Sequence, residues 1–211
     1  MSTLVCFALK EEAAPFHRVA AQHPGVVTLI VGIGRANAEK SVRKFLGNTG
    51  VPPELVLTCG FAGGLNPDLK IGDVVFEIGN RQLKIENALL AAGATPAKIH
   101  CADRIAITAM DKWKLWNDTN ADAVEMESAA IHAVCAEHGI ACVTLRVISD
   151  TAHEDLPLDF NALAKADQSI DFGKLFFTIA KSPGKIPQLM QLQKKTKFAA
   201  QQLADTLAKI I

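Results

Sequence analysis

The chain has 211 residues, 49% of them hydrophobic, and its 22 basic side chains balance 22 acidic ones for a formal net charge of zero. This length is typical of one domain, so we expect a single domain over residues 1–211. The neutral balance gives no electrostatic reason to expect nucleic-acid binding. No run approaches the roughly 18 apolar residues of a membrane span, and the start of the chain lacks the basic segment of a secretion signal. We therefore expect a cytoplasmic protein with neither a nucleic-acid nor a membrane partner.

The first half of the chain alternates short apolar runs with helical patterns. We expect strands at residues 3–9, 26–31, 55–59 and 73–77, where each run is short and apolar. Helical patterns cover residues 10–16, 35–46 and 85–92. The small residues at 60–64, Gly-Phe-Ala-Gly-Gly, follow the third strand and predict a turn.

The second half continues this alternation. An extended run at 99–107 precedes a helix at 112–116, a short strand at 121–124, a helix at 125–137, a strand at 141–148, a mostly helical stretch at 161–180 and a last helix that ends at 211. The strand at 141–148 is apolar except for Thr144 and Arg146, as a central strand should be. Strands alternating with helices predict βαβ units and a largely parallel, buried sheet.

Acidic residues and glycines gather where the expected strands end. They are Glu11 and Glu12, Gly32 and Gly34, residues 60–64, residues 125–127, and Ser149 with Asp150. Taken singly, each has an ordinary explanation, since glycines make tight turns, Asp150 caps a segment and Glu127 lies in a helix's first turn. The glycine pair also lacks the third glycine of a dinucleotide fingerprint. Because ligands of open α/β sheets bind beyond the carboxyl ends of the strands, the combination predicts one cleft.

Two short runs resemble a known family. Val-Glu-Met-Glu-Ser-Ala-Ala at 124–130 and Arg-Val-Ile-Ser-Asp at 146–150 are similar to the nucleoside phosphorylase/nucleosidase superfamily, in particular to its methylthioadenosine/S-adenosylhomocysteine nucleosidases. The resemblance runs from residue 3 to about 180 and includes the acidic motif at 8–12 and the glycines at 32–34 and 62–64. It implies a three-layer α/β sandwich with a twisted, mixed and largely parallel central sheet. It also implies a homodimer without cofactor or metal that hydrolyses the N-glycosidic bond of a purine nucleoside.

The resemblance implies a role for four residues of the reaction. Asp150 protonates the departing purine at N7, which is general acid catalysis. Glu12 orients and activates the attacking water. Glu127 binds the ribose 2′ and 3′ hydroxyls, because a carboxylate accepts both in charge-assisted hydrogen bonds. Met126 packs beneath the sugar as an apolar floor.

Five more residues join the site by resemblance. Ser149 and Arg146 position the loop that carries Asp150. Ile105, on the extended run, offers backbone groups to the purine. Phe61 and Gly63 complete the expected substrate-binding set.

The nucleophile is the main open question. Around the third strand, where phosphate-using relatives carry an arginine and a serine, this chain has Thr58 and Phe61, which supply little charge for an anion. Arg35 remains as a possible substitute. We expect water as the nucleophile. A purine nucleoside phosphorylase and a member that binds nucleosides without cleaving them stay open, although Glu12, Glu127 and Asp150 together favour catalysis.

The cysteines and the tail complete the sequence evidence. The five cysteines are odd in number and lie mostly in apolar runs, which favours buried, reduced thiols.

Residues 182–189 are similar to a hopanoid-associated subgroup that is thought to act on an adenosyl-linked lipid. Apolar tail residues recur at near-helical spacing: Ile186, Leu189, Met190, Leu203, Leu207 and Ile210. A helix packed on the core is the favoured interpretation, and a lip for an apolar substrate or a membrane surface is the alternative.

Overall fold

The computed structural model describes residues 2–79, 85–163, 165 and 172–211. Its elements in chain order are β1 (Thr3–Phe7), α1 (Lys10–Ala13), α2 (His17–Ala20), β2 (Val26–Ile30), α3 (Arg35–Asn48), β3 (Leu55–Gly64), β4 (Val74–Ile78), α4 (Ile85–Ala91), β5 (Thr95–Pro96), β6 (Ile99–Cys101), α5 (Ala109–Thr119), β7 (Ala123–Glu125), α6 (Ser128–Glu137), β8 (Ala141–Asp150), α7 (Phe160–Leu163), α8 (Phe172–Lys181), η1 (Pro183–Lys185) and α9 (Ile186–Ile210).

The described strands form one mixed sheet. β2, β1, β3 and β8 are parallel neighbours in that order. β4 adds to β8 in the antiparallel direction and carries β5 on its other side. β7 pairs antiparallel with the end of β3 and parallel with β6. The expected mixed and largely parallel sheet is confirmed.

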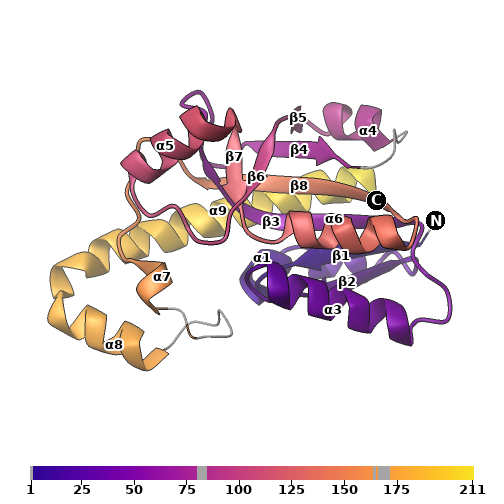
Figure 1. Cartoon of the computed structure of the whole chain (residues 1–211), viewed down its shortest axis with the longest axis horizontal. Helices are drawn as coiled ribbons and strands as arrows, with labels where there is room; N and C mark the ends of the chain where they lie inside the picture. The colour runs from indigo at the N-terminus through magenta and orange to yellow at the C-terminus, as the bar shows by residue number, and fades with distance from the viewer. Residues whose placement is uncertain (1, 80–84, 164, 166–171) are drawn as a thin grey trace.

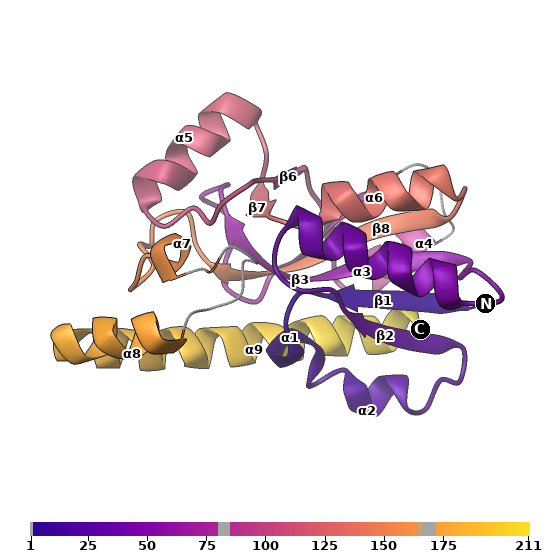
Figure 2. The same ribbon diagram turned by 60° about the horizontal axis from the view of Figure 1, so that its bottom comes forward.

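Helices cover both faces of this sheet, which gives the three layers expected from the sequence (Figure 1). Alternate residues of β1 face opposite ways, so Leu4 and Cys6 join one core while Val5 and Phe7 join the other. The first core is closed by α3 and α6, and the second by α9 with α1 and α4. Figure 2 shows α3 and α6 on one side of the strands and α9 on the other.

The strands β3 and β8 are longer than expected. The turn predicted at residues 60–64 is wrong, because these residues continue β3 as far as Gly64. β8 likewise runs through Ser149 to Asp150. The reason is mutual pairing: β3 keeps one parallel register with β8 as far as Ala62 opposite Ile148, and a one-residue shift then places Gly63 opposite Asp150. Gly63 and Gly64 also pair with β7. The glycine-rich segment is therefore held on both sides by neighbouring strands.

Three other boundaries differ from the sequence prediction. The helix expected at residues 10–16 ends at Ala13, and Pro15 separates it from a second short helix, α2, that begins at His17. Glu125 ends β7, so α6 begins only at Ser128. The extended run at 99–107 stops as a strand at Cys101, because the backbone of Ile105 and Ile107 bonds to residues 156–161 instead of to a strand.

The tail is helical, as expected, but only its second half packs on the core. In α9, Leu203 and Leu207 are buried against the sheet, whereas Ile186 and Met190 are exposed. Both views show the first half of α9 extending beyond the strands (Figures 1 and 2). The stretch expected to be helical over 161–180 is described only at its ends, as α7 and α8; residues 164 and 166–171 lie outside the described residues.

Two findings bear on the other sequence expectations. All five cysteines are free and buried, as predicted. Among the described helices, none is both long enough and apolar enough to cross a membrane.

Candidate active site

The ends of β7 and β8 and the segments that follow β1 and β2 meet around the glycine-rich end of β3. Two groups of polar side chains lie there, and we name each by its members. The glutamate cluster consists of Glu12, Glu125, Glu127 and Arg146. The aspartate group consists of Asp150, Ser149 and Lys112. Every one of these side chains is buried, although they carry charge or strong hydrogen-bonding groups.

Glu12 projects from α1 toward β3. One carboxylate oxygen accepts the Leu9 N–H at 2.8 Å, and the other accepts the Phe61 N–H at 2.9 Å. Burial raises the pKa of Glu12, and the Phe61 N–H and the Arg146 guanidinium oppose this rise without cancelling it. A carboxylate with a raised pKa is a stronger base, which suits a group that takes a proton from water.

Arg146 lies at the centre of the glutamate cluster. Its Nη2 contacts a Glu125 carboxylate oxygen, lies 3.6 Å from Glu127 Oε2 and donates to Thr58 Oγ1 at 3.2 Å. Gly60 makes room for this arrangement, since a Cβ there would lie 2.6 Å from Arg146 Nη1 and 2.8 Å from Glu12 Oε1. Arg146 therefore contacts the glutamates, and its expected influence on the loop of Asp150 stays a prediction.

Glu127 immediately precedes α6, and its carboxylate lies between the Gly34 N–H and the Arg146 guanidinium. Its Oε1 accepts the Gly34 N–H at 2.8 Å, so the glycine pair after β2 supplies a backbone donor. Burial raises the pKa of Glu127 to about 7, and the Glu125 carboxylate adds to the rise while Arg146 opposes it. The next residue before it, Met126, is half-buried.

Glu125 was not among the residues predicted for the site. Its carboxylate accepts the N–H groups of Glu127 at 3.0 Å and Ser128 at 2.9 Å, besides the contact with Arg146. Burial works against this carboxylate, but Arg146 and the donors of Glu127 and Ser128 outweigh it and lower the pKa of Glu125. Glu125 thus neutralises Arg146 and fixes the start of α6. The signal for it was present, because the same Glu-Met-Glu run contains both acids.

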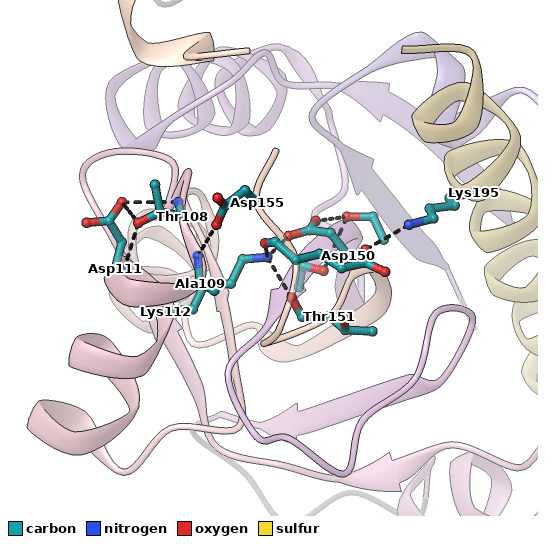
Figure 3. Close-up of polar contacts among 11 residues, drawn as sticks. Thr108, Ala109, Asp111, Lys112, Asp150, Thr151, Asp155 and Lys195 are labelled. Carbon is teal, nitrogen blue, oxygen red and sulfur yellow. Dashed lines mark hydrogen bonds and ion pairs between the residues drawn. The ribbon is translucent and has the colours of Figure 1, made fainter. Parts of the chain in front are cut away.

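Asp150 ends β8 on the other side of the β3 glycines. Ser149 Oγ donates to Asp150 Oδ1 at 2.7 Å, and Lys112 Nζ lies 2.5 Å from Asp150 Oδ2 (Figure 3). A Cβ at Gly63 would lie 3.3 Å from Asp150 Oδ2 and 3.8 Å from Lys112 Cε, so glycine leaves the pair its space. Lys112 was missed in the sequence. Its helical spacing was an available signal: Leu115 follows it by three residues and Trp116 by four, which places the lysine on the apolar face of α5.

Ile105 and Arg35 have partners outside both groups. The Ile105 N–H donates to Asn161 Oδ1 at 2.9 Å, and Asn161 Nδ2 donates to the Ile105 carbonyl at 2.9 Å. The two backbone groups expected to meet the purine are therefore bonded to a side chain of α7. Arg35 bonds to the Cys101 carbonyl, and its Nε lies 3.4 Å from Asp103 Oδ1.

Comparison with known proteins identifies the family of this chain. The family model of the phosphorylase superfamily matches residues 94–177. The 5′-methylthioadenosine/S-adenosylhomocysteine nucleosidase of Shewanella halifaxensis is 30% identical over 178 residues, which cover 68% of this chain and 76% of the relative. The chain belongs to the nucleoside phosphorylase/nucleosidase superfamily.

Other members of the superfamily agree in sequence and in fold. The aminodeoxyfutalosine nucleosidase of Helicobacter pylori is 27% identical over 186 residues, covering 73% of this chain and 80% of the relative. The crystal structure of Campylobacter jejuni 5′-methylthioadenosine/S-adenosylhomocysteine nucleosidase superposes with a TM-score of 0.71 at 20% identity, covering 100% of this chain and 98% of that one. At that identity the superposition speaks for the superfamily fold.

Within this superfamily member, the two groups are chemically complementary. The glutamate cluster offers carboxylate acceptors beside a guanidinium, which suits hydroxyl binding and water activation. The aspartate group offers a carboxyl that can exchange a proton beside an ammonium group. Among the residues that the structure describes, no group of three or more His, Cys, Asp or Glu side chains could hold a metal ion.

Proposed function

We propose that this chain is an N-glycosyl hydrolase that cleaves adenosine-type nucleosides with water, releasing the free base and the ribose moiety. The relatives named above are nucleosidases for 5′-methylthioadenosine, S-adenosylhomocysteine and aminodeoxyfutalosine. One observation carries the proposal: the buried carboxyl groups of Glu12 and Asp150 lie beside the glycine-rich end of β3, and that of Glu127 lies near Arg146, which reaches the same glycines.

The base and the sugar are handled by different groups. As the bond between C1′ and N9 breaks, its electron pair moves onto the purine, and Asp150 gives a proton to N7. Glu127 binds the 2′ and 3′ hydroxyls of ribose, and Met126 packs beneath the ring. Ser149 supports Asp150 through the hydrogen bond at 2.7 Å.

Glu12 serves as the base for the nucleophile. Its two backbone donors fix the carboxylate, and its raised pKa makes it a better proton acceptor near neutral pH. Water attacks C1′ as it loses its proton to Glu12. Phe61 contributes its backbone N–H to Glu12, and Gly63 keeps the space beside Asp150 open.

The arginines favour water over phosphate. A phosphate nucleophile needs cations that are free to bind it. Arg146 is held by Glu125 and lies near Glu127, and Arg35 is held by Cys101 and Asp103. Both arginines therefore already have anionic or carbonyl partners, and Thr58 Oγ1 accepts from Arg146.

The test is a panel of nucleosides assayed for free base with and without phosphate. The nucleosides are 5′-methylthioadenosine, S-adenosylhomocysteine, adenosine and aminodeoxyfutalosine. We expect at least one of them to release its base, at a rate that is the same with and without phosphate. Base release that requires phosphate and yields ribose 1-phosphate would identify a phosphorylase instead. Tight binding of these nucleosides without any base release would identify a non-catalytic member.

The assembly is also proposed to be a homodimer, without a membrane partner. A cavity of about 380 Å³ lies along α5, and its lining is mostly apolar: Leu65, Pro67, Ala109, Met110, Trp113, Trp116, Ala152 and His153. Met110 is 59% exposed and Trp113 is 57% exposed, which is costly in water for side chains of this size. Burial against a second copy of the chain would remove that cost.

A further inference from the structure

Lys112 is a fully buried lysine whose partners are all oxygen atoms. Its exposed fraction is 0%. The ammonium group lies 2.5 Å from Asp150 Oδ2 and donates to the carbonyls of Thr151 at 2.7 Å and Glu154 at 2.9 Å (Figure 3). These three acceptors match the three N–H bonds of a charged lysine. A buried ammonium persists only where such partners repay its lost hydration.

The start of α5, which carries Lys112, is ordered by its own cap and bonded to the loop that follows Asp150. Thr108 and Asp111 form a capping box at the start of α5, with Thr108 Oγ1 accepting the Asp111 N–H at 3.1 Å. Asp155 Oδ1 accepts the Ala109 N–H at 2.8 Å, so the same helix end is tied to the loop that follows Asp150 (Figure 3). The cap of α5 and its bond to the loop after Asp150 together fix the distance between Lys112 and Asp150.

We propose that Lys112 is a positioning residue that makes Asp150 the stronger proton donor, because its ammonium group stabilises the carboxylate that forms when Asp150 loses its proton. The inference rests on the proposed function. Lys112 lies outside the motifs that carry the family resemblance, so its part in the reaction is a new assignment.

The proton balance follows directly. Asp150 enters the step as the carboxylic acid, having taken its proton from solvent with the nucleoside bound. The proton passes from Asp150 to N7, and the electron pair of the C1′–N9 bond stays with the purine. Asp150 leaves the step as a carboxylate beside the Lys112 ammonium, whose own three protons stay in place.

A positive charge this close has two opposing effects on the rate. Before the reaction it favours the carboxylate form of its neighbour over the acid form. It also stabilises the charge that develops on Asp150 in the transition state, where water is excluded and the interaction is strong. Removing the charge should therefore lower the rate where Asp150 is fully protonated, and extend that protonated range to higher pH.

Most of the other charged side chains around Lys112 and Asp150 have hydrogen-bond or ion-pair partners of their own. Glu154 pairs with Lys195 of α9 at 2.8 Å, and Asp155 and Asp111 accept backbone or hydroxyl donors at the start of α5. His153 follows in the same loop and is exposed. Across β3, the glutamate cluster contains its own arginine. Among these groups, Lys112 is the cation in contact with Asp150.

The experiment compares Lys112→Met and Lys112→Gln with wild type by single-turnover cleavage across pH. Lys112→Gln removes the charge but keeps an amide that can donate to the Thr151 carbonyl, so it covers the case in which the methionine variant fails to fold. Lys114→Met is the matched control, because Lys114 is an exposed lysine on the same helix. We expect kcat at low pH to fall about tenfold or more and the high-pH limb of kcat to move up by about one pH unit or more. The control should match wild type.

A rate that falls equally at every pH, with the high-pH limb unmoved, would overturn the inference and leave Lys112 a structural role. A second measurement does not need activity. Lys112→Met leaves the Asp150 carboxylate buried without its partner, so it should melt at a lower temperature than wild type, and adding Asp150→Asn should restore part of the loss. If the losses in melting temperature of the two single variants simply add in the double variant, Lys112 and Asp150 do not stabilise each other, and the inference is overturned. If wild type releases no base from any nucleoside, the proposed function fails, while this melting result still reports on the pair.

Discussion

At the scale of single residues, the site concentrates charge where charge is costly. The buried carboxyl groups of Glu12, Glu125, Glu127 and Asp150 lie close to one guanidinium group and one ammonium group. Burying a charge destabilises a fold unless it is paired and hydrogen-bonded. Glu125 and Asp150 have a close cationic partner, whereas Glu12 and Glu127 rely mainly on backbone N–H donors. Burial raises the pKa of both Glu12 and Glu127, and the nearby Arg146 and these N–H donors offset only part of that rise.

Asp150→Asn tests the proton donor. Asparagine keeps the shape and can still hydrogen-bond N7, but it has no proton to deliver. We expect kcat to fall by about 10²-fold or more, since the interaction strengthens as the base departs. Single-turnover cleavage measures the loss, and thermal melting checks that the variant folds. An unreactive purine nucleoside analogue should still bind. Near wild-type turnover in a folded variant would place the proton donor elsewhere.

Glu127 should impose a pH dependence on ribose binding. With a pKa of about 7, the carboxyl is protonated below that pH and ionised above it. Only the carboxylate accepts both ribose hydroxyls, so kcat/KM for a ribonucleoside should fall about tenfold per pH unit below pH 7 and level off above it. Steady-state kinetics from pH 5 to 9 check this.

The matched variant for that prediction is Glu127→Gln. It should lower kcat/KM at neutral pH and remove the limb near pH 7, because glutamine does not titrate. A 2′-deoxynucleoside should lose less than its ribose counterpart, since one hydroxyl contact is already absent. Equal losses on the two substrates would argue against a contact with the 2′ hydroxyl.

At the scale of elements, α7 occupies the backbone groups expected to meet the purine. Asn161 accepts from the Ile105 N–H and donates to the Ile105 carbonyl, both at 2.9 Å. The amino edge of adenine also presents one acceptor beside one donor. A nucleoside bound as the resemblance implies would therefore compete with Asn161 for Ile105.

Asn161→Ala should relieve this competition. We expect KM for adenosine-type nucleosides to fall about threefold to tenfold with kcat nearly unchanged, which is the scale of one hydrogen bond. Asn161→Asp, which keeps an acceptor but loses the amide donor, should fall between alanine and wild type. A rise in KM for the alanine variant would show instead that Asn161 itself contacts the substrate.

The elements also differ in how far local sequence predicted them. The strand at 141–148 and the helix at 35–46 were found nearly in full, because each shows its own periodicity. The glycines at 60–64 were taken for a turn, because glycine breaks strands in isolation. Pairing with β7 and β8 overrides that tendency, and the missing side chains leave the space that Arg146, Glu12 and Asp150 occupy.

At the scale of the whole molecule, the exposed side of α5 bears on assembly. We expect the wild-type protein to sediment as a dimer and Trp113→Glu to shift it toward the monomer, because a charge at a buried apolar contact is costly. Analytical ultracentrifugation over a range of concentrations measures this. Val51→Glu is a control, since Val51 is 78% exposed and is not among the residues lining the α5 cavity. A wild-type monomer at every concentration would refute the dimer.

The sequence by itself determined the alternation of strands and helices and the largely parallel sheet, because periodicity is a local property of the chain. Its short motifs, which are also local, pointed to the family and, through that resemblance, to a mixed sheet. It also singled out Glu12, Glu127 and Asp150, which stand at the ends of strands. Only the tertiary structure decided their partners. Glu125 bonds to Arg146 across 21 residues, Lys112 bonds to Thr151 across 39, and Asn161 bonds to Ile105 across 56. Contacts at such separations depend on how the elements pack, and no local pattern encodes them.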